Sequence, residues 1–487
     1  MTHRCYLNDR RSFLKGMSGA GALSFLGGTG ILSAMASSTT AHAAEVSGYK
    51  AIVCLFLHGG QDCNDTVLPY DQASYDDYAQ LRPGLLADYA AKTGGSNRTL
   101  ERLLPLNPQN AADFGTRQFA LPDELEPIKN LFDSGNAAIL GNVGPLLQPM
   151  TRSEYQSGAL PRPKKLYSHN DQQSTWKSNA PEGTIVGWGG KFADAVVASG
   201  ANSEDKFTAI TTDGNTVFLS GDDVQQFALD SNGPPRVSGL RNFRSPLLGT
   251  GGRSELAKQL LEESYRNAGL NSNNLLKRDV STINNRAFDL NATFANALEN
   301  APELSTPFPG DSTARQLESV ANTINIRSAL GVGRQVFFVG IGGFDTHDNQ
   351  ATQLADRHTR YANAIASFYQ ATVEMGAEND VTLFTASDFG RALLENGDGT
   401  DHGWGGHHFI VGGAVNGNQI YGDIPPYITG HDQDAGNGRL IPQISVEQYA
   451  ATLGKWFGLN EAELGTALPN LANFSVKDLG FMASGTA

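Results

Sequence analysis

The sequence is poor in cysteine and in positive charge. Only three cysteines occur in 487 residues, which excludes a small disulfide-stabilised scaffold. The 36 Lys and Arg are outnumbered by 50 Asp and Glu, and the net charge is -14. Since no positive excess is left to neutralise phosphates, we expect no nucleic-acid partner. The hydrophobic fraction of 40% is ample for a core and excludes intrinsic disorder.

Several familiar catalytic motifs are also absent from the sequence. It contains no Gly-x-x-x-x-Gly-Lys-Ser/Thr phosphate loop, no Cys-x-x-Cys, no His-Glu-x-x-His and no Gly-x-Ser-x-Gly. Nucleotide-binding loops, zincin proteases and the common hydrolase nucleophile turn therefore have no support.

The long uncharged apolar stretch lies near the N-terminus, at residues 17–36. It follows a pair of arginines at positions 10 and 11 and precedes Ala-His-Ala at positions 41–43. These three features together are typical of a twin-arginine export signal. A membrane anchor is the alternative, but the stretch is rich in Gly and Ser, and no apolar run of about 18 residues recurs. We predict that residues 1–43 are a cleaved signal, that the twin-arginine translocase is a transient partner, and that the mature protein is periplasmic or extracellular without a stable membrane span.

The remaining residues, 44–487, alternate short apolar runs with helical patterns. The strongest predicted strands cover residues 50–57, 334–341 and 381–386, with weaker candidates at 137–140 and 409–415. This alternation predicts one α/β domain with a mostly parallel central sheet and helices on both faces. Residues from about 200 to 330 are more polar, and we expect either an inserted helical subdomain or crossover helices there.

Acidic residues and histidines follow the three strongest strands. Asp62 and Asp65 come after the first strand, Asp345 and His347 after the second, and Asp388 after the third, while His402 lies shortly beyond. The carboxyl ends of parallel strands gather at one edge of a sheet, where ligands bind. Carboxylates gathered there repel one another, and a cation is the usual way to hold them together. Each Asp taken singly could instead cap the next helix. The joint pattern predicts one shared polar site.

A further segment, at Ser168 and His169, precedes a predicted helix. Its serine could lie where backbone N–H groups stabilise an anion, or it could be an ordinary helix cap. Arg391 and the basic residues upstream of Ser168 could offset the charge of an anionic substrate, or they could form a solvated surface.

Four motifs together resemble the exported bacterial domain of unknown function 1501 family, whose members commonly carry twin-arginine signals. They are Gly59-Gly60-Gln61-Asp62, Gly343-Phe344-Asp345-Thr346-His347, Ser387-Asp388-Phe389-Gly390-Arg391 and Asp401-His402-Gly403-Trp404-Gly405. That family is placed in the alkaline phosphatase/sulfatase superfamily. The resemblance implies an alkaline phosphatase-like fold and metal ligation by Asp62 or Asp65, Asp345 with His347, Asp388 and His402. It also implies a nucleophile at a helix start, for which Ser168 is the match.

The sequence departs from the superfamily pattern at three points. Asp345 and His347 are two residues apart rather than four, and Phe389 stands where a ligating histidine is expected. The Cys-x-Pro-x-Arg motif of formylglycine sulfatases is missing. We therefore expect a single metal ion and no formylglycine chemistry.

Our hypothesis from the sequence is a metal-dependent hydrolase of small anionic phosphate or sulfate esters. One divalent ion would act with Ser168, with Arg391, and with His169 as general acid/base or anion contact. An Asp-rich ligand set favours Mg²⁺, Ca²⁺ or Mn²⁺, while Zn²⁺ stays open through the histidines. Two alternatives are a catalytically inactive exported binding or assembly protein and, more weakly, a metal-dependent oxidoreductase.

Overall fold

The computed structural model describes residues 48–91, 97–202, 205–230 and 252–483, so the predicted export signal lies outside the described residues. Strand β1 (Lys50–Leu57) occupies the middle of the sheet, and every residue after Lys50 is buried. It pairs in parallel with β8 (Arg334–Ile341) on one side and with β9 (Val381–Ser387) on the other. Such uniformly apolar strands are typical of a sheet covered on both faces.

The central sheet extends in both directions from these three strands. Beyond β8 lie β6 (Ala209–Thr211) and β7 (Phe227–Ala228), both parallel to it. Beyond β9 lie β12 (Gly406–Val411) and β5 (Ala137–Gly144), and the short strands β13 (Ile420–Gly422) and β14 (Ile444–Ser445) pair in parallel with β5. Only β12, among the nine described strands, runs antiparallel to its neighbours. The predicted mostly parallel sheet is confirmed.

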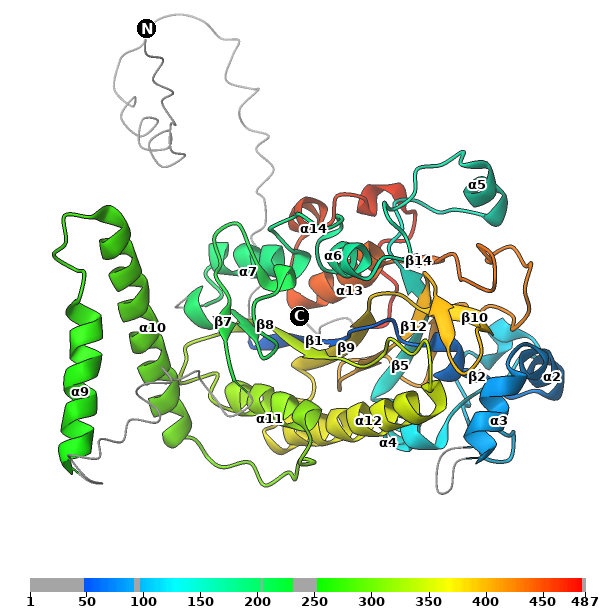
Figure 1. The fold of residues 1–487 in the computed structure, drawn as a ribbon, viewed down its shortest axis with the longest axis horizontal. Coiled ribbons are helices and arrows are strands. Elements are labelled where there is room, and N and C mark those ends of the chain that lie inside the picture. The colour runs from blue at the N-terminus through cyan, green and yellow to red at the C-terminus, as the bar shows by residue number, and fades with distance from the viewer. Residues whose placement is uncertain (1–47, 92–96, 203–204, 231–251, 484–487) are drawn as a thin grey trace, which may run out of the picture. The chain divides into compact units, whose positions relative to one another are not determined.

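Helices cover both faces of the sheet (Figure 1). One face is covered by α4 (Glu126–Asp133), α11 (Ser312–Asn325) and α12 (Gln350–Glu374). The other is covered by α6 (His169–Ser178), α7 (Trp188–Ala198), α13 (Val446–Phe457) and α14 (Glu461–Ala467). Alternate residues of β1 enter the two resulting cores, Val53 and Leu55 on the first face and Cys54 and Phe56 on the second.

The remaining elements flank this three-layer body. The segment that follows β1 contains two helices, α2 (Gln72–Leu81) and α3 (Pro83–Ala91). It also contains a small three-stranded sheet, made of β2 (Leu68–Pro69), β4 (Phe119–Leu121) and β3 (Leu104–Pro105). A hairpin of β10 (Arg391–Glu395) and β11 (Thr400–His402) follows β9, and α5 is Arg152–Ser157. The more polar region contains β6, β7, α11 and a helix pair, α9 (Gly252–Asn267) and α10 (Leu275–Glu299). No helix within the described ranges has the length and hydropathy needed to span a bilayer.

Candidate metal centre

The site forms at the carboxyl edge of the sheet, where four segments meet. Asp345 lies in the loop after β8, and Asp388 comes directly after β9. The β10–β11 hairpin then returns to the same edge and ends at His402, while His169 is the first residue of α6. Gly59, at the end of β1, has a φ of +118°, and a Cβ there would lie 2.3 Å from the backbone nitrogen of Asp345. A glycine is therefore needed for the Asp345 loop to approach this closely.

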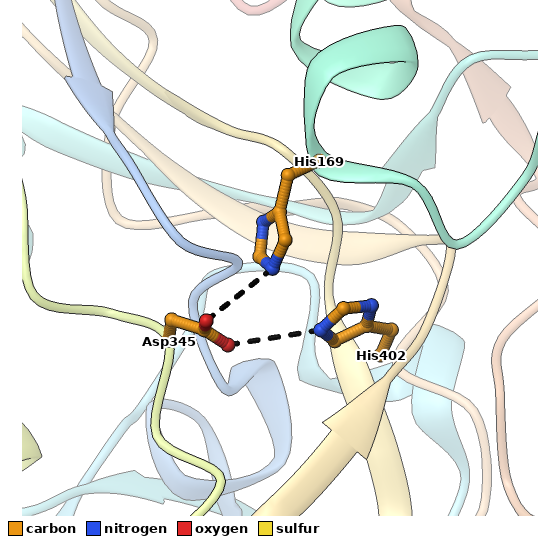
Figure 2. A group of neighbouring side chains, drawn as sticks. All are labelled: His169, Asp345 and His402. Carbon is orange, nitrogen blue, oxygen red and sulfur yellow. Dashed lines mark ion pairs between the residues drawn. The ribbon is translucent and has the colours of Figure 1, made fainter.

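Three side chains converge from these segments. Ligand atoms of His169, Asp345 and His402 lie within 4.8 Å of one another, and Figure 2 shows both rings turned toward the carboxylate. The Nε2 atoms of His169 and His402 are 3.5 and 3.7 Å from the Asp345 oxygens. His347 adds a third ring, whose Nε2 lies 3.2 Å from Asp345 Oδ1 and 2.7 Å from His402 Nε2. We refer to His169, Asp345, His347 and His402 as the donor group.

The opposite nitrogen of each ring faces an oxygen outside the donor group. His169 Nδ1 pairs with Asp388 Oδ2 at 2.7 Å, and His402 Nδ1 donates to the carbonyl of Tyr167 at 2.7 Å. His347 Nδ1 lies 3.8 Å from the Asp401 carboxylate. Such contacts fix ring orientation and leave Nε2 directed at the centre, which is the usual arrangement around a metal-ligating histidine.

Charge and burial set the protonation of the donor group. The hydrogen bond that His169 donates to Asp388 raises the pKa of this ring above its ordinary value, outweighing the effect of burial. Burial lowers the pKa of His402, so this ring is neutral at pH 7. Burial alone would raise the pKa of Asp345, but the hydrogen bond and charge of Arg391 hold it below the usual range. The centre therefore combines an ionised carboxylate with a neutral imidazole.

Two buried atoms of the site lack a hydrogen bond to any described residue, in a way that suits a cation. His169 Nε2 and Asp388 Oδ1 are buried and make no hydrogen bond within the described part of the chain. The Nε2 atoms of His347 and His402 face each other, and two protonated nitrogens could not do so. The two imidazoles and one carboxylate of His169, His402 and Asp345 form a nitrogen-rich set, with the His347 ring beside them. Such a set suits Zn²⁺ and similar transition ions better than Mg²⁺ or Ca²⁺. The residues present thus fit a bound divalent metal.

Asp62 and Asp65 have other partners. Arg82 binds Asp62 through two contacts of 2.6 and 3.1 Å, and all of these side-chain atoms are buried. Arg98 Nε donates to Asp65 Oδ1 at 2.7 Å, and Tyr89 donates to the other oxygen. Because the arginines already neutralise both carboxylates, neither needs a cation, and neither belongs to the donor group.

The remaining predicted site residues occupy the rim of the centre. Ser168 is the N-cap residue of α6, and its hydroxyl donates to Asp171 at 2.8 Å. Arg391 is fully buried, and its guanidinium donates to the carbonyls of Gly59 and Thr400 as well as to Asp345 at 3.1 Å. Arg391 therefore ties the strand-end loops together and orients Asp345.

Two side chains that support the donor group were not predicted from the sequence. Gln173, one helical turn after His169, donates to Asp388 Oδ2 at 2.9 Å, and its spacing of four residues was the available signal. Phe389 packs its ring 4.9 Å from that of His169 and 4.7 Å from that of His402. The residue that replaces an expected histidine thus supports two other histidines.

The structure is therefore that of an α/β protein with a histidine-rich candidate metal centre at the carboxyl edge of its sheet. A comparison with proteins of curated function finds no match. A family model described as "Protein of unknown function (DUF1501)" matches residues 49–464, and the chain belongs to this family. The family resemblance of the motifs is confirmed.

Solved structures with remote likeness include sulfatases and phosphatases. The PsFucS1 sulfatase from Pseudoalteromonas sp. shares 9% identity at a TM-score of 0.34, over 90% of this chain and 74% of the other. The lipoteichoic acid synthase LtaP from Listeria monocytogenes shares 8% identity at 0.30, over 88% and 78%. A variant of the alkaline phosphatase PafA shares 11% identity at 0.26, over 71% and 64%.

Proposed function

We propose that this protein is a metal-dependent hydrolase of phosphate or sulfate esters. The observation that carries the proposal is the convergence of His169, Asp345 and His402, with His347 beside them. The ester class follows from the family resemblance of the motifs. The nitrogen-rich donor group favours Zn²⁺ over the Mg²⁺, Ca²⁺ or Mn²⁺ that an Asp-rich ligand set would favour.

Each residue of the site has a role in this proposal. The donor group holds the ion, which when bound supplies Lewis acidity toward an ester oxygen and toward water. Asp388 and the Tyr167 carbonyl orient His169 and His402. Because the Ser168 hydroxyl is committed to Asp171, we infer that water rather than Ser168 attacks the ester. Arg391 is a positioning residue, since its donors are used within the protein.

The test combines metal analysis with an ester assay on the purified protein. We expect about one equivalent of zinc per chain and turnover of aryl phosphates or aryl sulfates. Asp345→Asn should weaken metal binding more than about 100-fold, beyond the loss typical of an outer-sphere change. Asp348→Asn, the same change at an exposed position three residues later, is the matched control and should keep both properties. Metal-free wild type without turnover would remove the proposal.

A second candidate is a catalytically inactive exported binding or assembly protein, and the occupied Ser168 hydroxyl favours it. It predicts that metal binds but no ester is cleaved. It also predicts that Asp345→Ala and His402→Ala fold normally and keep the biological effect of the protein.

We also propose that residues 1–43 direct export through the twin-arginine translocase. The supporting feature is the arginine pair at positions 10 and 11 ahead of a weakly apolar stretch. Replacing both arginines with lysine should leave the precursor in the cytoplasm, as fractionation of expressing cells would show. Unchanged export would contradict this route.

A further inference from the structure

The helix pair α9–α10 carries an unusual amount of exposed apolar surface. Of the twelve exposed large hydrophobic side chains among the described residues, eight lie between residues 256 and 283. They are Leu256, Leu260, Tyr265, Leu270, Leu275, Leu276, Val280 and Ile283. Scattered single hydrophobic residues are normal on a surface, but a concentration of this kind marks an interaction site.

On α10 these residues belong to a regular stripe. Apolar residues recur at alternating steps of four and three along the whole helix, which is the spacing of a coiled-coil seam. The seam consists of Leu276, Val280, Ile283, Ala287, Leu290, Phe294 and Ala297. It is continuous, so one geometric face of α10 carries all seven residues.

The two halves of this seam have different surroundings. In the C-terminal half, Phe294 is 2% exposed and packs on Phe207 and Phe227 of the domain core. In the N-terminal half, Val280 is 49% exposed and Ile283 is 67% exposed. Within the described ranges, the stripe is covered at one end and bare at the other, so its N-terminal half has no packing partner there.

Helix α9 does not supply that partner, because it packs on a different side of α10. Its Arg266 binds Asp289 at 2.7 Å and accepts a hydrogen bond from Asn285 through its carbonyl. Ser281 of α10 is buried against Gly269 in the connection between the helices. Ser281, Asn285 and Asp289 all lie away from the seam. Figure 1 shows the two helices side by side.

We propose that the exposed half of the seam pairs with the same surface of a second copy of this chain, through an antiparallel α10–α10 contact about a two-fold axis. The charge balance of the helix pair favours a second copy of the chain as the partner. Residues 252–299 contain six Lys and Arg and six Asp and Glu, so a chain of net charge -14 meets its copy through a neutral segment.

The flanking charges are also complementary to themselves. Asp279 and Arg286 are seven residues apart and border the same edge of the seam. A two-fold axis between Val280 and Ile283 reverses their order in the second copy, so Asp279 of each copy faces Arg286 of the other. Both side chains are exposed, and the ion pair that Arg286 makes with the described part of its own chain is a loose one, 3.7 Å from Asp205.

Sedimentation equilibrium of the purified full chain tests the proposal. We expect a monomer–dimer equilibrium in the micromolar range. The double variant Val280→Glu/Ile283→Glu should be monomeric with an unchanged circular dichroism spectrum, because both residues are on the surface. Arg278→Glu, a charge change on an exposed face turned away from the seam, should leave dimerisation unaltered.

Charge reversal distinguishes a second copy from any other occupant. Asp279→Arg and Arg286→Asp should each weaken dimerisation about tenfold or more, since every change places like charges together twice. The double variant Asp279→Arg/Arg286→Asp should restore most of the affinity. A monomer at every concentration, or a dimer indifferent to these changes, would overturn the proposal. So would binding of the monomer to phosphatidylcholine vesicles that Val280→Glu/Ile283→Glu abolishes, since it would assign the seam to a lipid surface.

Discussion

Two pairs of aspartates at the same edge of the sheet show how much the partner of a carboxylate decides. Asp62 and Asp65 follow β1 and are bound by the buried arginines Arg82 and Arg98. Asp345 follows β8 and faces the imidazoles of the donor group instead, and Asp388 follows β9 and pairs with His169. The negative charges of the first pair are balanced at every accessible pH, because arginine stays charged. The second is completed by imidazoles, which in their neutral form can offer a lone pair to a metal.

Substitutions in the two pairs should therefore have different consequences for the protein. Loss of a partner in the arginine-bound pair should appear as loss of stability, because it leaves a buried charge uncompensated. Loss of a partner in the donor group should appear in metal binding, because the side chains there are partly exposed and can be solvated.

Replacing Arg82 with methionine should have the largest effect. The change leaves the fully buried carboxylate of Asp62 without its ion pair, so we expect the free energy of unfolding to fall by about 3–5 kcal/mol. Urea denaturation measures it. Arg102→Met is the matched control, because its pair with Asp123 lies on the surface and should contribute less than about 1 kcal/mol. Metal content should not change; loss of metal at unchanged stability would mean that Asp62 belongs to the centre.

Buried histidines give a second stability effect, and it depends on pH. Burial lowers the pKa of His407 from 6.5 to about 4, so this ring is neutral in the folded protein when the unfolded chain already takes up a proton. The resulting stability is present above pH 6.5 and is lost as the pH falls through 4, by about 3 kcal/mol in total. His407→Gln should flatten the decline of the urea midpoint between pH 6.5 and 4. An equal decline in both proteins would contradict this reading.

The sheet could be predicted from the sequence, but the different partners of the two aspartate pairs could not. Uniformly apolar strands predict a parallel sheet that is covered on both faces, and the ends of these strands predict where polar residues gather. The reversed β12 was not foreseen, because its residues read like those of any buried strand. The arginines that bind Asp62 and Asp65 lie 20 and 33 residues later in the chain, in segments without a motif. Pairing at that distance depends on tertiary packing, which local patterns do not encode.

The orienting carboxylate Asp388 should have an intermediate effect, confined to the donor group. Asp388→Asn keeps an acceptor for His169 Nδ1 but removes the negative charge that raises the pKa of this ring. We expect zinc affinity to fall about 10- to 100-fold, as measured by competition with a chromogenic chelator. Asp401→Asn should reduce the affinity less, because the Asp401 side chain is half-exposed and lies 3.8 Å from His347. Equal losses of zinc affinity in the two variants would show that the negative charge around the donor group supports metal binding, and not the short contact between Asp388 and His169.

Ser168→Ala should have the smallest effect, and it decides the nature of the nucleophile. The hydroxyl of Ser168 makes a hydrogen bond to Asp171 rather than capping α6, so its loss should change stability by no more than about 1 kcal/mol. If water attacks the ester, the variant should keep its kcat within about threefold and bind metal as the wild type does. If Ser168 forms a covalent intermediate, kcat should instead fall by several orders of magnitude at unchanged metal content. The assay thus separates a residue that only starts the helix carrying His169 from one that takes part in the chemistry.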